Sequence, residues 1–238
     1  MEQLYGPVRF SQREPLVQWS GGRALTTPAL GRPSGDRWGA TLLQAEGLAA
    51  FRGERVVFRD VSFAVPGGGA LFLMGPNGSG KSTLLRLLAG LLRPAAGRLL
   101  WRGEDALNEP TSHAMRTTYV GHLDAVKPAL TAAENLRFAA RLGGGSVEQA
   151  LAALGLLELA DVPARMLSAG QKRRLALARL RLSRAPLWLV DEPTLGLDEG
   201  SLARVGAIME SHRSGGGILI VATHVPLPLA GADVLQMG

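Results

Sequence analysis

A glycine-rich loop stands between an apolar strand and a leucine-rich helix, and this order of elements constrains the fold more than any other stretch of the chain. Residues 70–74 are all apolar, which is typical of a strand buried on both faces. Glycines in 75–80 break this strand, and residues 82–89 follow with leucines available for a buried helix face. Strand, loop and helix in this order predict an α/β domain.

The loop fits the phosphate-binding pattern G-x-x-x-x-G-K-[ST] in full. Its glycines let backbone N–H groups point inward as a nest for an anion. We expect Lys81 to reach the β- and γ-phosphates of a nucleotide, the Ser82 hydroxyl to ligate Mg²⁺, and Thr83 to lie near the α-phosphate. The alternative, a glycine-rich turn that happens to precede Lys-Ser, is disfavoured by the strand before it and the helix after it. The predicted nucleotide-binding residues of the loop are Gly75, Pro76, Asn77, Gly78, Ser79, Gly80, Lys81, Ser82 and Thr83.

Strands and helices also alternate in the rest of the chain from residue 42. This alternation predicts a mainly parallel sheet that binds phosphate at the carboxyl ends of its strands. Two stretches, 131–134 and 146–149, have the capping-box form that starts a helix, with a hydroxyl residue followed three positions later by Glu or Gln. The expected elements are strands at 42–48, 55–58, 61–65, 187–190 and 217–223, a helical segment over about 119–165, and a helix over about 199–211.

Residues 1–41 have a different character from the remainder. They contain many Gly, Pro and Ser residues and no sustained apolar period. We therefore expect either a disordered extension or a start codon assigned too far upstream, with the folded domain at 42–238.

The composition excludes some kinds of protein. A length of 238 residues with 46% hydrophobic residues suits one α/β domain with, at most, a small subdomain. The absence of cysteine excludes disulfides and Cys-ligated metal sites, and the apolar runs are too short to cross a bilayer. No export signal is recognisable at the start, so a cytoplasmic location is expected.

The net charge of +6 comes mostly from arginine. Blocks of basic residues interleaved with aromatic residues are missing, so this charge fits GC-rich coding better than nucleic-acid binding. Attraction to an anionic membrane surface is compatible with the same charge.

Two acids and a histidine follow two of the expected strands. Asp191 and Glu192 come directly after the apolar run 187–190, where Asp191 is expected to hold Mg²⁺ and Glu192 to polarise the attacking water. His224 ends the strand 217–223 and should face the same crevice, near the γ-phosphate and the water. A solvated acidic turn and a structural histidine are the alternatives, and the matching positions at two strand ends disfavour both.

A second candidate phosphate site lies at Leu167-Ser168-Ala169-Gly170-Gln171, followed by a basic, amphipathic helix. The capping Ser168 and the bare Gly170 offer free N–H groups and a positive helix end to an anion. One small domain seldom needs two phosphate-binding sites for one triphosphate. This second site is therefore predicted to bind the nucleotide of a neighbouring subunit.

The phosphate loop, helical insertion, LSAGQ element, acid pair and histidine, in this order, resemble the ATP-binding cassette (ABC) ATPases over about residues 42–236. The resemblance implies a P-loop domain with a mainly parallel core sheet, a small antiparallel β subdomain and a helical subdomain. It also implies a head-to-tail homodimer, in which Ser168 and Gly170 of one subunit touch the γ-phosphate bound by Lys81 of the other. The cofactors would be ATP and Mg²⁺. The roles carried over are catalytic for Lys81, Glu192 and His224, and metal-binding for Ser82 and Asp191.

A narrower resemblance is carried by residues 119–122, 130–136 and 167–180. It is to the CcmA-like ATP-binding subunits of haem exporters in cytochrome c maturation. Most cassettes have glutamine where His122 stands and glycine where Ala169 stands, and CcmA-like proteins share both departures. The family glutamine links magnesium and water to the membrane subunit, so His122 is counted with the nucleotide site. A plain loop residue is the alternative at His122.

This resemblance implies a transport motor in which ATP closes the dimer and hydrolysis reopens it. The partners would be an integral membrane CcmB-type subunit and haem-handling cytochrome c maturation proteins, with no nucleic acid, at the cytoplasmic face of the bacterial inner membrane. Both passage of haem through the complex and release of haem from a periplasmic carrier stay open. The alternative is the ATP-binding subunit of another small exporter, for a lipid, a drug or a polysaccharide.

Two further classes are disfavoured. Soluble cassette proteins of translation or DNA repair carry two cassettes or a long coiled coil, and this chain has one Gly-Lys dipeptide and no heptad run. A subunit that binds nucleotide without hydrolysis would not need the full set of catalytic residues. The stacking partner of adenine stays open between Phe51 and Arg52, whose planar guanidinium can also stack.

Overall fold

The computed structural model describes residues 41–225, 227 and 229–238. The sequence-based prediction for residues 1–41 lies outside this range, except for Thr41, which begins the first strand. Among the described residues, no helix has both the length and the apolar character that crossing a bilayer requires.

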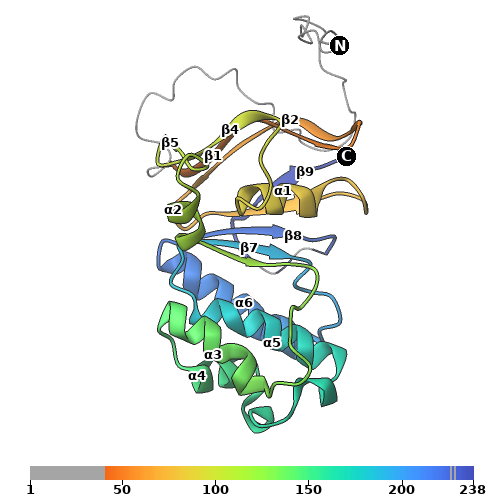
Figure 1. The fold of residues 1–238 in the computed structure, drawn as a ribbon, viewed down its shortest axis with the longest axis vertical. Helices are drawn as coiled ribbons and strands as arrows, with labels where there is room; N and C mark the ends of the chain where they lie inside the picture. The colour runs from red at the N-terminus through yellow and green to blue at the C-terminus, as the bar shows by residue number, and fades with distance from the viewer. Residues whose placement is uncertain (1–40, 226, 228) are drawn as a thin grey trace, which may run out of the picture. The chain divides into compact units, whose positions relative to one another are not determined.

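Two sheets and the helices between and below them make up the described fold (Figure 1). All pairings in the larger sheet are parallel, and all pairings in the smaller sheet are antiparallel. The α/β class, with a parallel core sheet and a small antiparallel sheet, is confirmed. The antiparallel sheet has the order β2-β1-β4-β5, and the parallel sheet has the order β6-β7-β8-β3-β9. The strands are β1 (Thr41–Arg52), β2 (Arg55–Pro66), β3 (Ala70–Met74), β4 (Ala96–Trp101), β5 (Glu104–Asp105), β6 (Thr117–Val120), β7 (Leu187–Asp191), β8 (Ile218–Ala222) and β9 (Asp233–Gln236).

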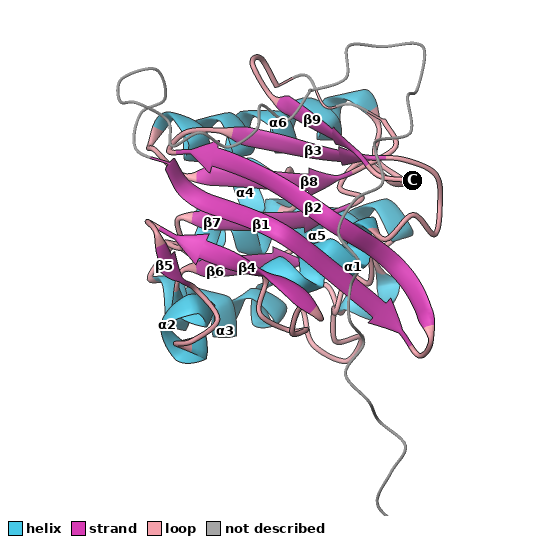
Figure 2. Ribbon diagram, turned by 90° about the horizontal axis from the view of Figure 1, so that it is seen from above, coloured by secondary structure: helices cyan, strands magenta, loops and turns pink. Residues whose placement is uncertain are grey.

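The helices form layers on both faces of the parallel sheet. Helix α1 lies between the two sheets, while α5 and α6 cover the opposite face of the parallel sheet, with α3 and α4 beyond them (Figure 1). Seen from above, the long strands β1 and β2 cross over α1 and the parallel sheet (Figure 2). The helices are α1 (Lys81–Leu88), α2 (Pro110–Met115), α3 (Ala132–Gly143), α4 (Val147–Ala153), α5 (Ala169–Leu182) and α6 (Glu199–Ser214), with 3₁₀ turns at Leu157–Leu159 and Ala164–Met166.

Strand β8 shows why the core strands read as unbroken apolar runs. Ile218 and Ile220 belong to the core that contains α1, while Leu219 and Val221 belong to the core that contains α5. Because alternate side chains of a strand point to opposite faces, a sheet covered on both sides needs apolar residues at every position.

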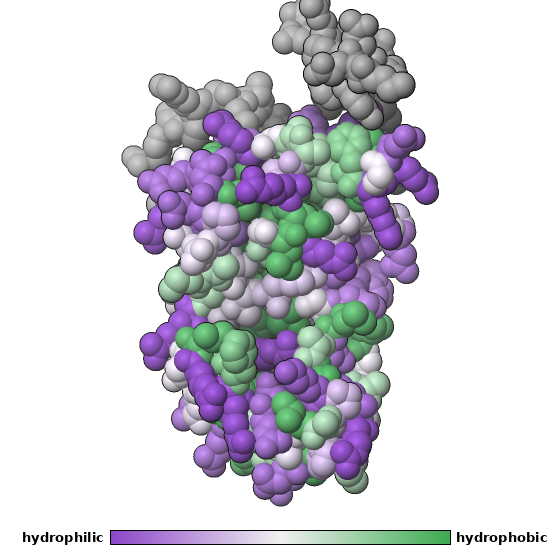
Figure 3. All heavy atoms as spheres, viewed as in Figure 1, coloured by the Kyte–Doolittle hydropathy of each residue, from purple (hydrophilic) through white to green (hydrophobic). Residues whose placement is uncertain are grey.

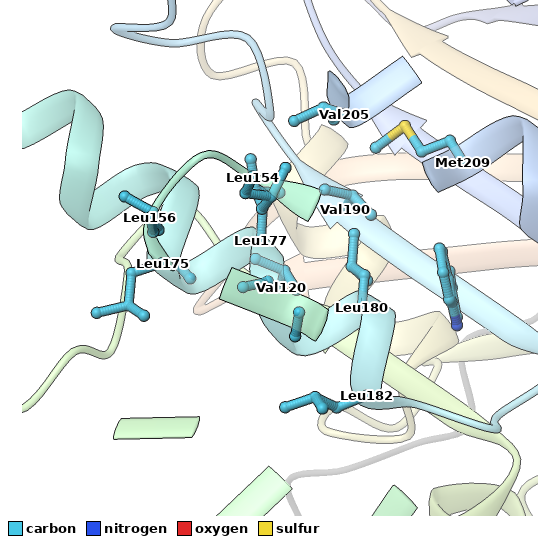
Figure 4. Close-up of a cluster of buried hydrophobic side chains, with 14 of the residues drawn as sticks. Val120, Leu154, Leu156, Leu175, Leu177, Leu180, Leu182, Val190, Val205 and Met209 are labelled. Carbon is cyan, nitrogen blue, oxygen red and sulfur yellow. The ribbon is translucent and has the colours of Figure 1, made fainter. Parts of the chain in front are cut away.

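The second core is centred on α5 (Figure 4). Its consecutive residues 175–178 are all buried, so this helix is enclosed by neighbours around most of its circumference. The prediction of an amphipathic helix here is wrong, because α3, α4, α6 and the sheet surround α5. The labelled neighbours of α5 in Figure 4 are Val120, Leu154, Leu156, Val190, Val205 and Met209.

The hairpin of β1 and β2 corrects another prediction. Strands were expected separately at 55–58 and 61–65, but β2 is continuous across Asp60. The backbone of Asp60 is left-handed, with φ of 57°, and the pairing with β1 shifts register on either side of Leu48. A bulge adds twist without ending a strand, so the exposed pair of residues 59–60 looks like a turn in the sequence.

The helical segment begins later than expected. Strand β6 ends at Val120, so residues 119–120 belong to the parallel sheet. At the start of α3 the capping box is complete, with Thr131 Oγ1 accepting from Glu134 N–H and Glu134 Oε2 accepting from Thr131 N–H. At the start of α4, by contrast, only the bond from Gln149 N–H to the Ser146 hydroxyl forms.

Candidate nucleotide site

The phosphate loop connects β3 to α1 and needs glycine for two separate reasons. Gly75 has φ of 148°, and a Cβ at this position would overlap the carbonyl oxygen of Met237. Gly80 is the N-cap of α1 and is left-handed, with φ of 97°. The loop can therefore bring backbone N–H groups close to a bound anion in a way that side chains at these positions would prevent.

Lys81 is buried in this loop. Its Nζ donates to Gly75 O at 2.6 Å and to Pro76 O at 3.0 Å. An ammonium group has three donors, so one remains for a phosphate oxygen. The hydroxyl of Ser79 is also buried, and it has no hydrogen-bond partner among the described residues. The loop thus fits the phosphate chain of a nucleotide.

Asp191 ends β7 as a buried carboxylate. The residue is 1% exposed, and neither side-chain oxygen has a hydrogen-bond partner in the described part of the chain. Burial raises the pKa of Asp191, whereas the Ser82 hydroxyl and the charge of His122 act to lower that pKa. A buried carboxylate without a partner is costly unless a cation compensates it. Ser82 and His122 are thus near enough to Asp191 to affect its pKa, and the buried carboxylate itself would be compensated by a bound cation.

Glu192 lies next to His224 at the neighbouring strand end. The backbone of Glu192 is left-handed, with φ of 49°, and its N–H donates to Ala222 O at 2.8 Å. The side chain is mostly buried, and its Oε2 lies 2.8 Å from His224 Nδ1. The two atoms are in close contact without hydrogen-bond geometry, because Oε2 has no hydrogen-bond partner among the described residues. Half of the His224 side chain remains exposed and can face a ligand.

Ser168 and Gly170 stand at the start of α5. Ser168 Oγ accepts from Gln171 N–H at 3.2 Å, and Gln171 Oε1 accepts from Ser168 N–H at 2.8 Å, which completes a capping box. At Gly170 a Cβ would lie 2.8 Å from Gly196 O, so only glycine fits against the turn that follows the acid pair. In Figure 1 the start of α5 lies away from the loop before α1, beyond the ends of β7 and β8.

Sequence reasoning missed Arg173, which is 5% exposed and lies among these groups. Its guanidinium donates to the carbonyl oxygens of Asp191, Glu192 and Gly121 and to Asp124 Oδ1. In the sequence it is the middle residue of a Lys-Arg-Arg run, which is typical of an exposed surface, so its pattern gave no signal of burial. Phe51 and Arg52, the candidates for stacking on adenine, are both exposed at the end of β1.

Comparison with known proteins places this geometry in a family. The family model described as ABC transporter matches residues 58–195, more than half of the chain. A relative in Paramagnetospirillum magneticum, the "Cytochrome c biogenesis ATP-binding export protein CcmA", is 51% identical over 81% of this chain and 92% of its own length. The protein of the same name in Rhodospirillum rubrum is 52% identical over 82% of this chain and 85% of its own length.

A solved structure of the ATP-binding subunit of an ABC transporter is also similar. It has a TM-score of 0.70 and 27% identity, over 78% of this chain and 80% of that chain. The segment matched by the family model, residues 58–195, contains the phosphate loop, the LSAGQ element and the acid pair, and His224 lies beyond that segment. The chain therefore belongs to the ABC transporter family, in its CcmA branch, and is an ATPase subunit of that family.

Proposed function

We propose that this chain is the ATP-hydrolysing subunit of a haem-export system in c-type cytochrome biogenesis. The observation that carries the proposal is the identity of about half of all positions, over four fifths of the chain, with proteins named for this process. The His122 and Ala169 departures from the common cassette pattern point to the same branch.

The test is deletion of the gene followed by haem staining for covalently attached haem. Loss of c-type cytochromes, with recovery by the wild-type chain but not by Lys81→Ala, is the expected result. Normal c-type cytochromes in the deletion strain would contradict the proposal. They would favour the alternative exporter, whose cargo is a lipid, a drug or a polysaccharide.

At the site, the backbone N–H groups of the loop and the free donor of Lys81 bind the β- and γ-phosphates. Ser82 and Asp191 would hold Mg²⁺, which when bound neutralises charge on the phosphate oxygens. Glu192 orients the attacking water and accepts its proton. The contact with His224 fixes the Glu192 carboxylate from one side and adds a donor for the γ-phosphate.

The active form in this proposal is a homodimer. Ser168 and Gly170 form an anion-binding helix start that lies away from the phosphate loop of their own chain (Figure 1). A second subunit in head-to-tail orientation would place its γ-phosphate at this helix start. Each nucleotide would then be held by the loop of one chain and by α5 of the other.

The partner is an integral membrane subunit of the CcmB type, which would hold the chain peripherally on the cytoplasmic face of the inner membrane. A candidate contact region, named here the α3 face, consists of Phe138 and Leu142 on α3 and of Leu123 in the loop between β6 and α3, each more than 70% exposed. Phe138 and Leu142 are one helical turn apart, and hydrophobic side chains gather over α3 in Figure 3. Asn135 ties this helix to the loop before it through a bond to Lys127 O at 3.1 Å.

The triple substitution of the α3 face by serine tests this contact. We expect ATP binding to persist while co-purification with the membrane subunit is lost. Val234→Ser, on the edge strand β9, removes an exposed apolar side chain elsewhere and serves as the matched control. Retention of the complex by the triple variant would rule out this face as the docking surface.

A further inference from the structure

The guanidinium of Arg173 joins three parts of the site that are far apart in the sequence. One terminal nitrogen donates to Gly121 O and to Asp124 Oδ1, each at 3.0 Å. The other terminal nitrogen donates to Glu192 O at 2.9 Å and to Asp191 O. Arg173 therefore connects α5 to the loop that carries His122 and to the backbone of the acid pair.

These bonds hold the part of the backbone that sets the direction of the catalytic carboxylate. Glu192 has a left-handed backbone, which costs free energy for a residue with a side chain and persists only where the surroundings enforce it. Arg173 donates to the carbonyls on the two sides of the Glu192 Cα, those of Asp191 and of Glu192 itself, and Ala222 O accepts from the Glu192 N–H. Loss of the guanidinium would free the Glu192 backbone while leaving every group of the phosphate loop in place.

Arg173 lies on the same helix as Ser168 and Gly170, the residues proposed to contact the other subunit's nucleotide. It follows Ser168 and Gly170 by five and three residues in one continuous, capped helix. A helix of this kind moves as a unit, so a shift at its start also shifts Arg173. We propose that Arg173 is a positioning residue that couples the start of α5, and the loop 121–124, to the catalytic Glu192 of the same chain. This inference rests on the proposed dimer, because the start of α5 meets the other subunit's nucleotide there.

The charge arrangement supports a dedicated role for arginine at this position. Asp124 is the acidic partner of Arg173, with a side chain that is 29% exposed. Its backbone oxygen accepts a further bond from Arg179, whose pKa is lowered by burial and, less strongly, by the charge of Arg173. Four acceptors in separate directions need the planar fork of a guanidinium, and a lysine ammonium has only three donors.

The experiment compares Arg173→Gln and Arg173→Lys with Arg174→Gln in the full-length chain. Arg174 is the matched control, because it donates to Leu154 O at 3.0 Å and Gly155 O at 3.4 Å, within the helical segment only. For both Arg173 variants we expect kcat for ATP to fall about 10- to 100-fold, the cost typical of a misplaced catalytic group. KM should change less than about threefold, and the Hill coefficient for ATP should fall toward one.

Asp124→Asn keeps Arg173 and removes only its counter-ion, so it provides a milder variant should the Arg173 variants fail to fold. Asp124→Asn should also lower kcat. In the double variant Asp124→Asn, Arg173→Lys, the loss of kcat should be smaller than the two single losses combined. An unchanged kcat and Hill coefficient in folded Arg173 variants, or an equal loss in Arg174→Gln, would overturn the inference. These readouts concern hydrolysis alone, so they stay separate from the haem-staining result that tests the cellular function.

Discussion

At the scale of single residues, the site combines polar groups that have hydrogen-bond partners with buried polar groups that have none among the described residues. Lys81 and Ser168 have hydrogen-bond partners inside the chain, whereas the Asp191 carboxylate is buried without one in the described structure. Such a group reduces the stability of the fold, and in the proposed function it is retained because it would hold Mg²⁺.

Asp191→Asn should therefore stabilise the chain in the absence of nucleotide and Mg²⁺. The pKa of Asp191 is raised by burial from an ordinary value of 3.8, so the ionised form is disfavoured in the folded state. The gain from the substitution should be absent below pH 3.8 and should grow as the pH rises through the raised pKa. Thermal unfolding across this pH range measures the effect, and a lower midpoint for the variant at neutral pH would contradict it.

Lys81→Ala should lower ATP hydrolysis by about 100-fold or more, since a donor aimed at developing charge is lost. Phosphate release by the purified chain measures the effect. Near-normal turnover in this variant would remove Lys81 and its loop from the mechanism.

Candidate site residues that belong to a short pattern could be located from the sequence, and those that act through distant contacts could not. Gly75 to Ser82 and the acid pair have fixed spacings that follow from phosphate geometry. Arg173 acts through carbonyl oxygens, which every residue has, so the identity of its partners leaves no trace in the sequence. Only the folded chain shows that it is buried.

At the scale of elements, hydrophobic pattern and capping signals located the strands β1, β2, β3, β7 and β8 and the helices α1, α3, α4, α5 and α6, but not β4, β5, β6, β9 or α2. The double-sided apolar strands β7 and β8 were predicted to within one residue at each end. The bulge at Asp60 was not predicted, because a pair of polar, exposed residues inside a strand has the same composition as a turn. Enclosure of α5 was also missed, since it depends on helices brought from elsewhere in the chain.

Two capping boxes allow a structural role to be separated from a functional one. Thr131→Ala and Ser168→Ala each remove an N-cap hydroxyl from a complete box, at a cost of about 1 kcal/mol of stability. Only Ser168→Ala should also lower ATP hydrolysis, because the start of α5 is proposed to bind the partner's nucleotide. Denaturant unfolding and ATPase assays on both variants test this. Equal activities would make Ser168 a helix cap and nothing more.

At the scale of the whole molecule, the parallel sheet brings the phosphate loop, the acid pair and His224 to one edge, while α5 begins beyond that edge (Figure 1). A single chain thus holds one complete loop and, at the start of α5, a second helix N-terminus that we propose binds the nucleotide of another chain. Two chains in head-to-tail orientation satisfy both. We propose that each ATP lies between two subunits in this arrangement.

The variant Glu192→Gln tests whether two chains share each nucleotide. The substitution keeps the shape of the site and removes the carboxylate that accepts the proton, so ATP should bind and persist. Gel filtration with ATP and Mg²⁺ should then show a dimer, and the Glu192→Gln, Lys81→Ala double variant should remain monomeric. A Glu192→Gln chain that binds ATP and elutes only as a monomer would contradict the shared-site account.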